Sequence, residues 1–274
     1  MKTFIADLRQ HWKYRPFIWS ECEDISLRKV RLPACGRVLV LGPHPDDPES
    51  VAITCKLLMQ SGCDIWYAIA SMSPSGVEDE YAYRRLNSNS ISLQEKKIEI
   101  RQKEQTQSAE MFGLIPDRLA FLGIEEDKEL DSPKNLARIR DHLESVAPDI
   151  VILPIGKDQN QTHAWVYQVF RKFAKDLTLK TEKPIIALYH EDPKTIEIRK
   201  DLFVLFGEKG ANWKGELLKI HDSQQQRNIH SRGTGFDERI LHMDHLNWRH
   251  LGEISTPAGS SAKYAEVFEI ELFD

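Results

Sequence analysis

Short apolar runs alternate with longer stretches of helical spacing between residues 37 and 190. Continuous aliphatic runs closed by Gly or Pro are typical of strands that are buried on both faces. Five apolar runs occur, at 38–41, 65–70, 119–122, 150–153 and 185–188, and those at 38–41 and 150–153 are closed by Gly or Pro. Helical spacing predicts helices over 50–60, 96–112, 133–146 and 163–173. This alternation predicts an α/β fold, a Rossmann-like three-layer sandwich with a mostly parallel sheet.

The first part of the chain lacks a clear period. We interpret residues 1–36 as an irregular N-terminal extension, packed on the domain through Trp12, Phe17 and Trp19. Residues 37–274 then form a single domain, because no linker or internal repeat divides them.

Later segments also have weaker patterns. Residues 73–93 are polar and predict a long loop of the kind that often shapes a binding site. The last third predicts less regular structure, with a helix near 215–229 and a terminal strand at 267–272.

Charge and composition exclude several classes of protein. The formal net charge of −5 over 274 residues gives no basic footprint for nucleic acid. No stretch approaches the ~20 apolar residues of a membrane span, and residues 1–15 lack the apolar core of a signal peptide. We therefore expect a cytoplasmic protein with a small-molecule substrate and neither a nucleic-acid nor a membrane partner. The sequence leaves open whether the protein forms a homo-oligomer.

The four cysteines are not spaced as metal ligands. Cys22, Cys35, Cys55 and Cys63 form no CxxC pair, and the last two lie in apolar stretches. Reduced thiols are the favoured interpretation, over a disulfide framework or a cysteine–zinc site.

Metal-type ligands follow two of the predicted strands. His44, Asp46 and Asp47 come directly after the first strand, and His163 follows the fourth at the start of a helix. The carboxyl ends of parallel strands meet at one edge of a sheet, where ligands bind. Imidazole and carboxylate groups are the usual ligands of a catalytic zinc, which keeps one position open for water. We predict that His44, Asp47 and His163 bind one Zn²⁺ per chain.

Two features of the first segment bear on this prediction. Asp46 lies beside the ligands and is free to accept a proton from water, while Pro43, Pro45 and Pro48 stiffen the loop. A polar turn whose aspartates cap the next helix is the alternative. The second histidine-bearing segment at the expected sheet edge favours the metal site.

At this point the chain resembles the PIG-L/LmbE-type deacetylases. Residues 44–49, His-Pro-Asp-Asp-Pro-Glu, are similar to the HPDDxE signature of that family. Further similar elements follow in the same order: an RxxE helix at 101–104, a strand beginning Pro-Asp at 148–154, an HxSQ element at 221–224 and a YAExF segment at 264–268. Together they span about residues 37–272.

The resemblance implies removal of an N-acyl group, typically acetyl, from an amino sugar or its conjugate. It assigns His44, Asp47 and His163 as zinc ligands, Asp46 as the general base and Arg101 as a substrate-hydroxyl contact. It also places Asn160, Asp158 and His221 near the substrate. Without the resemblance, the residues favour a plain surface charge for Arg101, and they leave His221 open between lining the site and packing in a polar core.

One departure from the family pattern concerns the acid step. Many members have His-Pro-Asp-His where this chain has residues 160–163, Asn-Gln-Thr-His. Asn160 can donate a hydrogen bond but cannot deliver a proton, and Thr162 lacks the charge of a carboxylate neighbour. Asp46, Asp158 or a late histidine would then protonate the leaving amine. A weakened family member that only binds a glycan is the alternative function.

Other patterns carry less weight. His242 and His245 share a helical face near Asp244, so a second metal there stays open. Residues 232–236, Arg-Gly-Thr-Gly-Phe, neither follow a strand nor match GxGxxG, which makes a phosphate loop a weak interpretation. A dinucleotide-binding function is disfavoured because residues 42–45 lack the glycines that admit a pyrophosphate. The sequence does not name the substrate.

Overall fold

The computed structural model describes residues 1–14, 16–22, 31–86, 90–126, 129–254 and 261–274. Within these residues the helices are α1 (Lys2–His11), α2 (Ala52–Gln60), α3 (Asp79–Arg85), α4 (Leu93–Phe112), α5 (Pro133–Val146), α6 (Gln161–Thr181), α7 (Glu208–Ile220), α8 (Asp222–Arg232) and α9 (Phe236–Ile254). The strands are β1 (Phe17–Ser20), β2 (Arg37–Gly42), β3 (Asp64–Ile69), β4 (Leu119–Phe121), β5 (Ile150–Pro154), β6 (Ile185–His190), β7 (Leu202–Phe206) and β8 (Tyr264–Phe273).

The described strands form one mixed sheet in the order β1-β7-β8-β6-β5-β2-β3-β4. Strand β8 runs antiparallel to both of its neighbours, β6 and β7. The other neighbouring pairs are parallel. The predicted α/β fold with a mostly parallel sheet is therefore confirmed.

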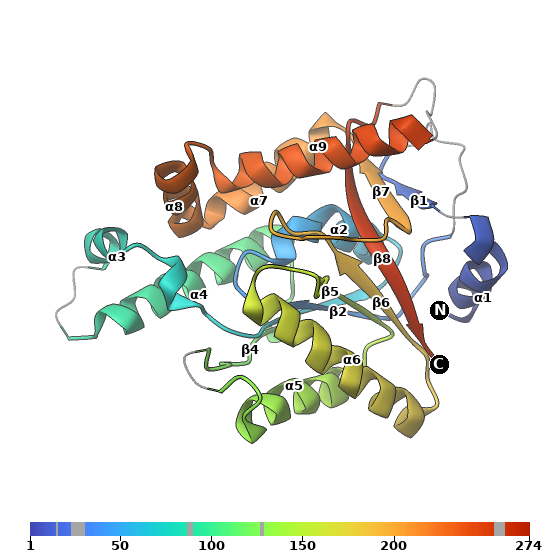
Figure 1. The fold of residues 1–274 in the computed structure, drawn as a ribbon, viewed down its shortest axis with the longest axis horizontal. Helices are drawn as coiled ribbons and strands as arrows, with labels where there is room; N and C mark the ends of the chain where they lie inside the picture. The colour runs from blue at the N-terminus through green and yellow to red at the C-terminus, as the bar shows by residue number, and fades with distance from the viewer. Residues whose placement is uncertain (15, 23–30, 87–89, 127–128, 255–260) are drawn as a thin grey trace.

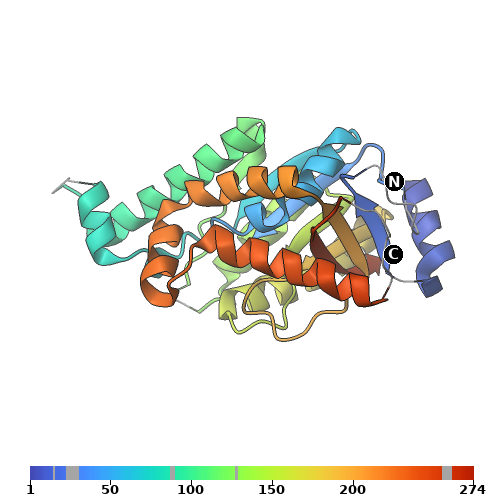
Figure 2. The same cartoon turned by 90° about the horizontal axis from the view of Figure 1, so that it is seen from above.

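Helices cover both faces of the sheet (Figures 1 and 2). Alternate residues of a strand point to opposite faces, so Val38 and Val40 of β2 pack in the cluster that contains α1, α2, α4 and α7. Leu39 and Leu41 pack instead with α5 and α6. A third cluster joins α9 to alternate residues of β7 and β8. The sandwich thus has the three layers that the pattern predicts.

Residues 1–36 are more regular than expected. α1 buries Phe4, Ile5 and Leu8 in the main core, and β1 forms the edge strand beside β7, with Phe17 opposite Leu202. Phe17 and Trp19 are buried, whereas Trp12 is 39% exposed. The expectation of an irregular extension was wrong because a four-residue strand is too short to show a period, and its pairing depends on a distant partner.

Two other expectations need correction. The 73–93 segment contains α3 in its described part, so it is not a continuous loop. The last third is regular, since it supplies β7, β8 and three helices. The helix expected near 215–229 is two helices, α7 and α8, because the backbone of His221 leaves the helical region with ψ of 60°.

Two smaller findings complete the fold. Cys22, Cys35, Cys55 and Cys63 form no disulfide bond in the structure. No helix in the described part of the chain combines the length and the apolar character needed to cross a lipid bilayer.

Candidate metal centre

The two ligand-bearing segments meet at one edge of the sheet. β2 and β5 are neighbouring parallel strands, with Val38 opposite Ile150, so they end side by side. Residues 43–47 leave β2 and enter a short 3-10 helix at Pro48–Val51. Residues 155–160 leave β5 and enter α6. This is the edge at which open parallel sheets bind their ligands.

The loop after β2 holds its two aspartates in different environments. Asp47 Oδ2 accepts a hydrogen bond of 2.7 Å from the backbone N–H of His44, which closes the loop on itself. Asp46 has φ of 93°, a left-handed conformation that residues other than Gly rarely adopt. Its backbone N–H donates to Gln105 Oε1 at 3.1 Å. The carboxylate of Asp46 then pairs with Arg101, while that of Asp47 faces the two histidines.

His163 is fixed by the start of α6. The side-chain oxygen of Asn160 is the N-cap acceptor and receives the backbone N–H groups of Thr162 at 2.9 Å and His163 at 3.4 Å. An Asn N-cap contributes about 1 kcal/mol to helix stability. Asn160 therefore has a structural task at one end of its amide, in addition to any contact with substrate.

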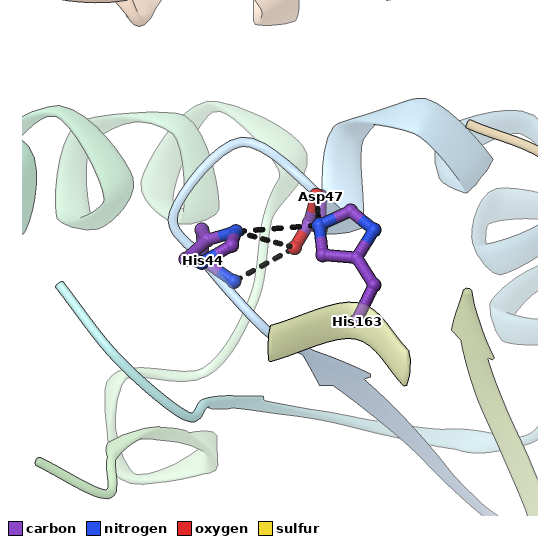
Figure 3. Close-up of side chains that lie close together, drawn as sticks. All are labelled: His44, Asp47 and His163. Atoms are coloured by element: carbon purple, nitrogen blue, oxygen red, sulfur yellow. Dashed lines mark hydrogen bonds and ion pairs between the residues drawn. The ribbon is translucent and has the colours of Figure 1, made fainter. Parts of the chain in front are cut away.

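Three ligand atoms converge between these segments (Figure 3). His44 Nδ1 lies 3.3 Å from His163 Nε2 and 3.8 Å from Asp47 Oδ2. His163 Nε2 lies 3.7 Å from Asp47 Oδ1. Ligand atoms about 2.0–2.1 Å from a tetrahedral zinc are about 3.4 Å apart. The three side chains are buried, and their donor atoms have the chemistry and separation that suit a zinc ion.

Each histidine has a carboxylate behind its ring. His44 Nε2 lies 2.8 Å from Glu126 Oε1, and His163 Nδ1 lies 3.4 Å from Asp158 Oδ2. Thr162 Oγ1 also donates to Glu126 Oε1, at 2.9 Å. Carboxylates in this position fix the tautomer and orientation of metal-binding histidines. The negative charge that a carboxylate at position 162 would supply therefore comes from Glu126, which lies on another loop. Thr162 binds this carboxylate through its hydroxyl group.

The charges of the site are strongly coupled. Burial raises the pKa of Asp47 to about 7, against the influence of His163. Burial opposes the protonation of His163, but the carboxylates of Asp47 and Asp158 raise its pKa to about 9. Burial opposes the ionisation of Glu126, but its interactions with His44, together with the hydrogen bond from Thr162, lower its pKa to about 2. The carboxylates around His163 therefore favour positive charge at the point where the three ligand atoms meet.

Arg101 contacts Asp46. Its guanidinium is buried and donates to the carboxylate of Asp46 and to the carbonyl of Pro45. Both residues line the cavity above the three ligand atoms. The predicted contact of Arg101 with substrate hydroxyls stays a prediction, and the structure adds a role in orienting Asp46.

The other predicted residues lie at different depths. The side chain of Asp158 has 0% exposure behind His163. His221 is fully buried, with Nε2 3.2 Å from Glu49 Oε2, between α7 and α8. Neither of these residues lines the cavity, whereas Asn160 does. Their direct contact with substrate stays a prediction, although the depth of Asp158 and His221 favours a supporting role.

The second histidine cluster does not form a site in the part of the chain that the structure describes. His245 Nδ1 contacts the carbonyl of Lys263 at 2.9 Å. Asp244 is buried in an ion pair with Lys214. Among the described residues, groups of metal-type ligands occur around His163 and not around His242.

Sequence reasoning missed Glu126 and Asp192. Glu126 follows β4, and Asp192 follows β6, so both leave the same sheet edge as the predicted ligands. Asp192 lines the cavity, and burial raises the pKa of its carboxyl. The rule that located His44 and His163 would have found both acids, had it been applied to every predicted strand.

The family comparison agrees with this geometry. The model described as "PIG-L: GlcNAc-PI de-N-acetylase" matches residues 39–174, which include the three ligand residues. The chain belongs to the PIG-L family. No curated protein matches the chain by sequence.

Solved structures share the fold at low identity. N,N'-diacetylchitobiose deacetylase from Pyrococcus horikoshii is 18% identical, with a TM-score of 0.63 over 86% of this chain and 83% of its own. GalB, the 4-carboxy-2-hydroxymuconate hydratase from Pseudomonas putida, is 21% identical, with a TM-score of 0.62 over 85% and 95%. The zinc-inhibited form of teicoplanin deacetylase Orf2 is 13% identical, with a TM-score of 0.57 over 87% and 99%. The fold thus carries deacetylases and a hydratase, so the reaction has to be inferred from the site.

Proposed function

We propose that the protein is a zinc-dependent N-deacetylase that removes an acetyl group from an amino sugar or an amino-sugar conjugate. The observation that carries the proposal is the convergence of His44 Nδ1, His163 Nε2 and the Asp47 carboxylate at separations that suit zinc. Membership of a family described by a de-N-acetylase supports the reaction. The amino-sugar substrate is the finer part of the proposal.

The metal would be held by His44, Asp47 and His163. A zinc ion there supplies Lewis-acid polarisation of the amide carbonyl and lowers the pKa of a water molecule toward about 7. Asp46 lines the same cavity and holds the proton that the attacking water loses. Arg101 keeps the Asp46 carboxylate turned toward the cavity.

The leaving amine must gain a proton before it departs. Asp158 and His221 lie behind the cavity wall, and His245 is engaged with Lys263. Asp46 can return the proton it accepted, and Asp192 is the other partly buried acid that lines the cavity outside the ligand set, among the described residues. Although residue 160 is asparagine and not the histidine of many family members, Asp46 and Asp192 can therefore protonate the leaving amine.

The glycan-binding alternative rests on Asn160 and Thr162. Glu126 weakens it, because this carboxylate provides the negative charge next to His44 that Thr162 cannot provide. Because Glu126 orients His44 in place of a carboxylate at position 162, the site favours catalysis over glycan binding alone.

The test combines metal analysis with amine release. We expect about one zinc per purified chain, and release of free amine from N-acetylated sugars that stops on chelation and returns with zinc. Full zinc occupancy with no amine released across a panel of N-acetylated sugars would support binding alone. Water addition to an unsaturated dicarboxylate, without amide hydrolysis, would support a hydratase instead.

A further inference from the structure

One wall of the cavity is cationic. Lys194 from the loop after β6, Arg227 and Arg232 from α8 and Arg239 from α9 line the same cavity as the three ligand residues. The cavity also contains the Asp46–Arg101 pair, which is internally neutral. Apart from that pair and the ligand Asp47, Asp192 is the one carboxylate among the described lining residues, against four cations.

The hydrogen bonds of these arginines go to neutral groups. Arg227 donates to the carbonyl of Gly76 at 3.4 Å, and Arg239 donates to Asn228 Oδ1. Arg232 donates to Ser231 Oγ at 2.9 Å. Elsewhere, partly or fully buried cations such as Lys56 and Lys214 pair with carboxylates. Within the described residues, no carboxylate lies within ion-pair distance of Lys194 or the three arginines.

The turn between α8 and α9 brings two of these charges together. α8 ends at Arg232 because Gly233 adopts a left-handed φ of 75°. Gln225 Oε1 accepts the backbone N–H of Phe236 at 2.7 Å and fixes the start of α9. Arg239 then lies in the first turn of α9, near Arg232. The 232–236 segment, a poor match to a phosphate loop, thus places the side chain of Arg232 at the cavity, near Arg239.

Arg239 lies in an environment that disfavours its charge. It is half-buried, and burial together with the charge of Arg232 lowers its pKa, although the charge of Asp192 opposes this. The acidic residues beside it do not compensate, since Asp237 faces Lys219 at 3.9 Å and Glu238 accepts the backbone N–H of Gly235. An excess of positive charge beside a cluster of metal-type ligands, opposed in this wall by Asp192 alone among the described lining residues, is typical of a site for an anion.

We propose that the substrate carries an anionic group, a phosphate or a carboxylate, and that Arg227, Arg232 and Arg239 bind it while the acylamino group lies at His44, Asp47 and His163. This substrate class rests on the proposed function for the reaction itself. Guanidinium groups bind both anions through paired N–H donors. The shared chemistry is a compact oxyanion on the sugar, away from the amide.

Binding of deacetylated sugars tests the anion site without any turnover. By calorimetry on the zinc-loaded protein, we expect glucosamine 6-phosphate or muramic acid to bind at least about tenfold more tightly than glucosamine. A preference for the first identifies a phosphate site, and a preference for the second identifies a carboxylate site. Equal affinity for all three sugars overturns the proposal.

Variants assign the effect to the arginines. Arg239→Gln and the exposed Arg227→Gln should each lose most of the anion preference, and Arg227→Gln covers the case in which the Arg239 variant misfolds. Arg249→Gln, exposed on the same helix as Arg239, should keep it. An anion preference that survives both cavity variants overturns the assignment.

The outcome separates the two proposals. Arginine-dependent binding of an anionic sugar, with no amine released from its N-acetyl form, sustains the anion site and removes the deacetylase. Equal amine release from N-acetylglucosamine and N-acetylglucosamine 6-phosphate, unchanged in Arg239→Gln, removes the anion site and sustains the deacetylase.

Discussion

Glu126 Oε1 lies 2.8 Å from Nε2 of His44, on the side of the ring opposite the atom that faces His163 and Asp47. These two residues come from loops after different strands, β4 and β2. The contact fixes which nitrogen of His44 is available to a metal, because the other nitrogen donates to the carboxylate.

Glu126→Gln should weaken zinc binding. Loss of the carboxylate leaves His44 without its orienting charge, and such changes cost about tenfold to a hundredfold in metal affinity. Competition with a chromophoric chelator measures the affinity. Glu125→Gln is the matched control, since Glu125 pairs with Lys134. Unchanged affinity in Glu126→Gln would show that His44 needs no such partner. Thr162→Val should give a smaller loss in the same direction.

Asp46→Asn should keep the metal and lose most of the turnover. Removing a general base costs about 10²–10⁴ in rate, while the three ligand residues are untouched. Asn is the suitable replacement because it tolerates the left-handed backbone at this position better than most residues do. Zinc content and amine release are measured on the same sample. Near wild-type turnover in the zinc-loaded variant excludes Asp46 from proton transfer.

Lys214→Met should strongly destabilise the fold. Lys214 Nζ is fully buried and donates to Asp244 at 2.7 Å and to Glu266 at 2.8 Å, as well as to the carbonyl of Ser50 at 2.6 Å. Breaking a buried ion pair from one side costs about 3–5 kcal/mol. Urea denaturation measures the loss. Lys209→Met, exposed on the same helix, should change stability by less than about 0.5 kcal/mol; an equal loss in both variants contradicts the expectation.

His190 should make the fold sensitive to acid. Burial lowers its pKa from 6.5 to about 4. The unfolded chain therefore binds more protons between these values, and the contribution of His190 to stability is complete above pH 6.5 and lost as the pH falls toward 4. The loss is about 3 kcal/mol.

His190→Gln should remove that part of the pH dependence. Denaturation midpoints measured at pH 7 and pH 4.5 compare the variant with the natural protein, and His250→Gln, exposed on α9, serves as the control. The same slope in all three proteins would show that His190 does not titrate with unfolding.

The sequence predicts the central fold well because its signals are local. The strands β2, β3, β5 and β6 each contain a continuous apolar run, and α5 begins at Pro133 and ends at Val146, as predicted. β1 was missed because its pairing with β7, far along the chain, leaves no local signal in the sequence. β7 was missed although its five apolar residues, 202–206, carry the same local signal as the five residues of β5.

The residues of the site also divide into those with a local signal in the sequence and those without one. His44, Asp47 and His163 were found from strand ends and motif spacing, and the structure brings them together. Glu126 was missed because the polar residues after β4 were not considered together with those after β2 and β5, and no motif spacing links Glu126 to His44, 82 residues away. The cationic wall was missed because it combines a turn, two helices and a loop, which look like ordinary surface charges when taken one at a time.

The antiparallel strand β8 has a consequence for assembly. β7 and β1 reach the remainder of the sheet through β8, which is made from residues 264–273 (Figure 1). β1 is therefore synthesised before β8 and cannot be joined to the central strands until the chain beyond residue 264 has been made. Such distant pairings slow folding. Until β8 is in place, α1, the preceding helix, can bury the apolar side chains of β1, against which it packs in the folded protein.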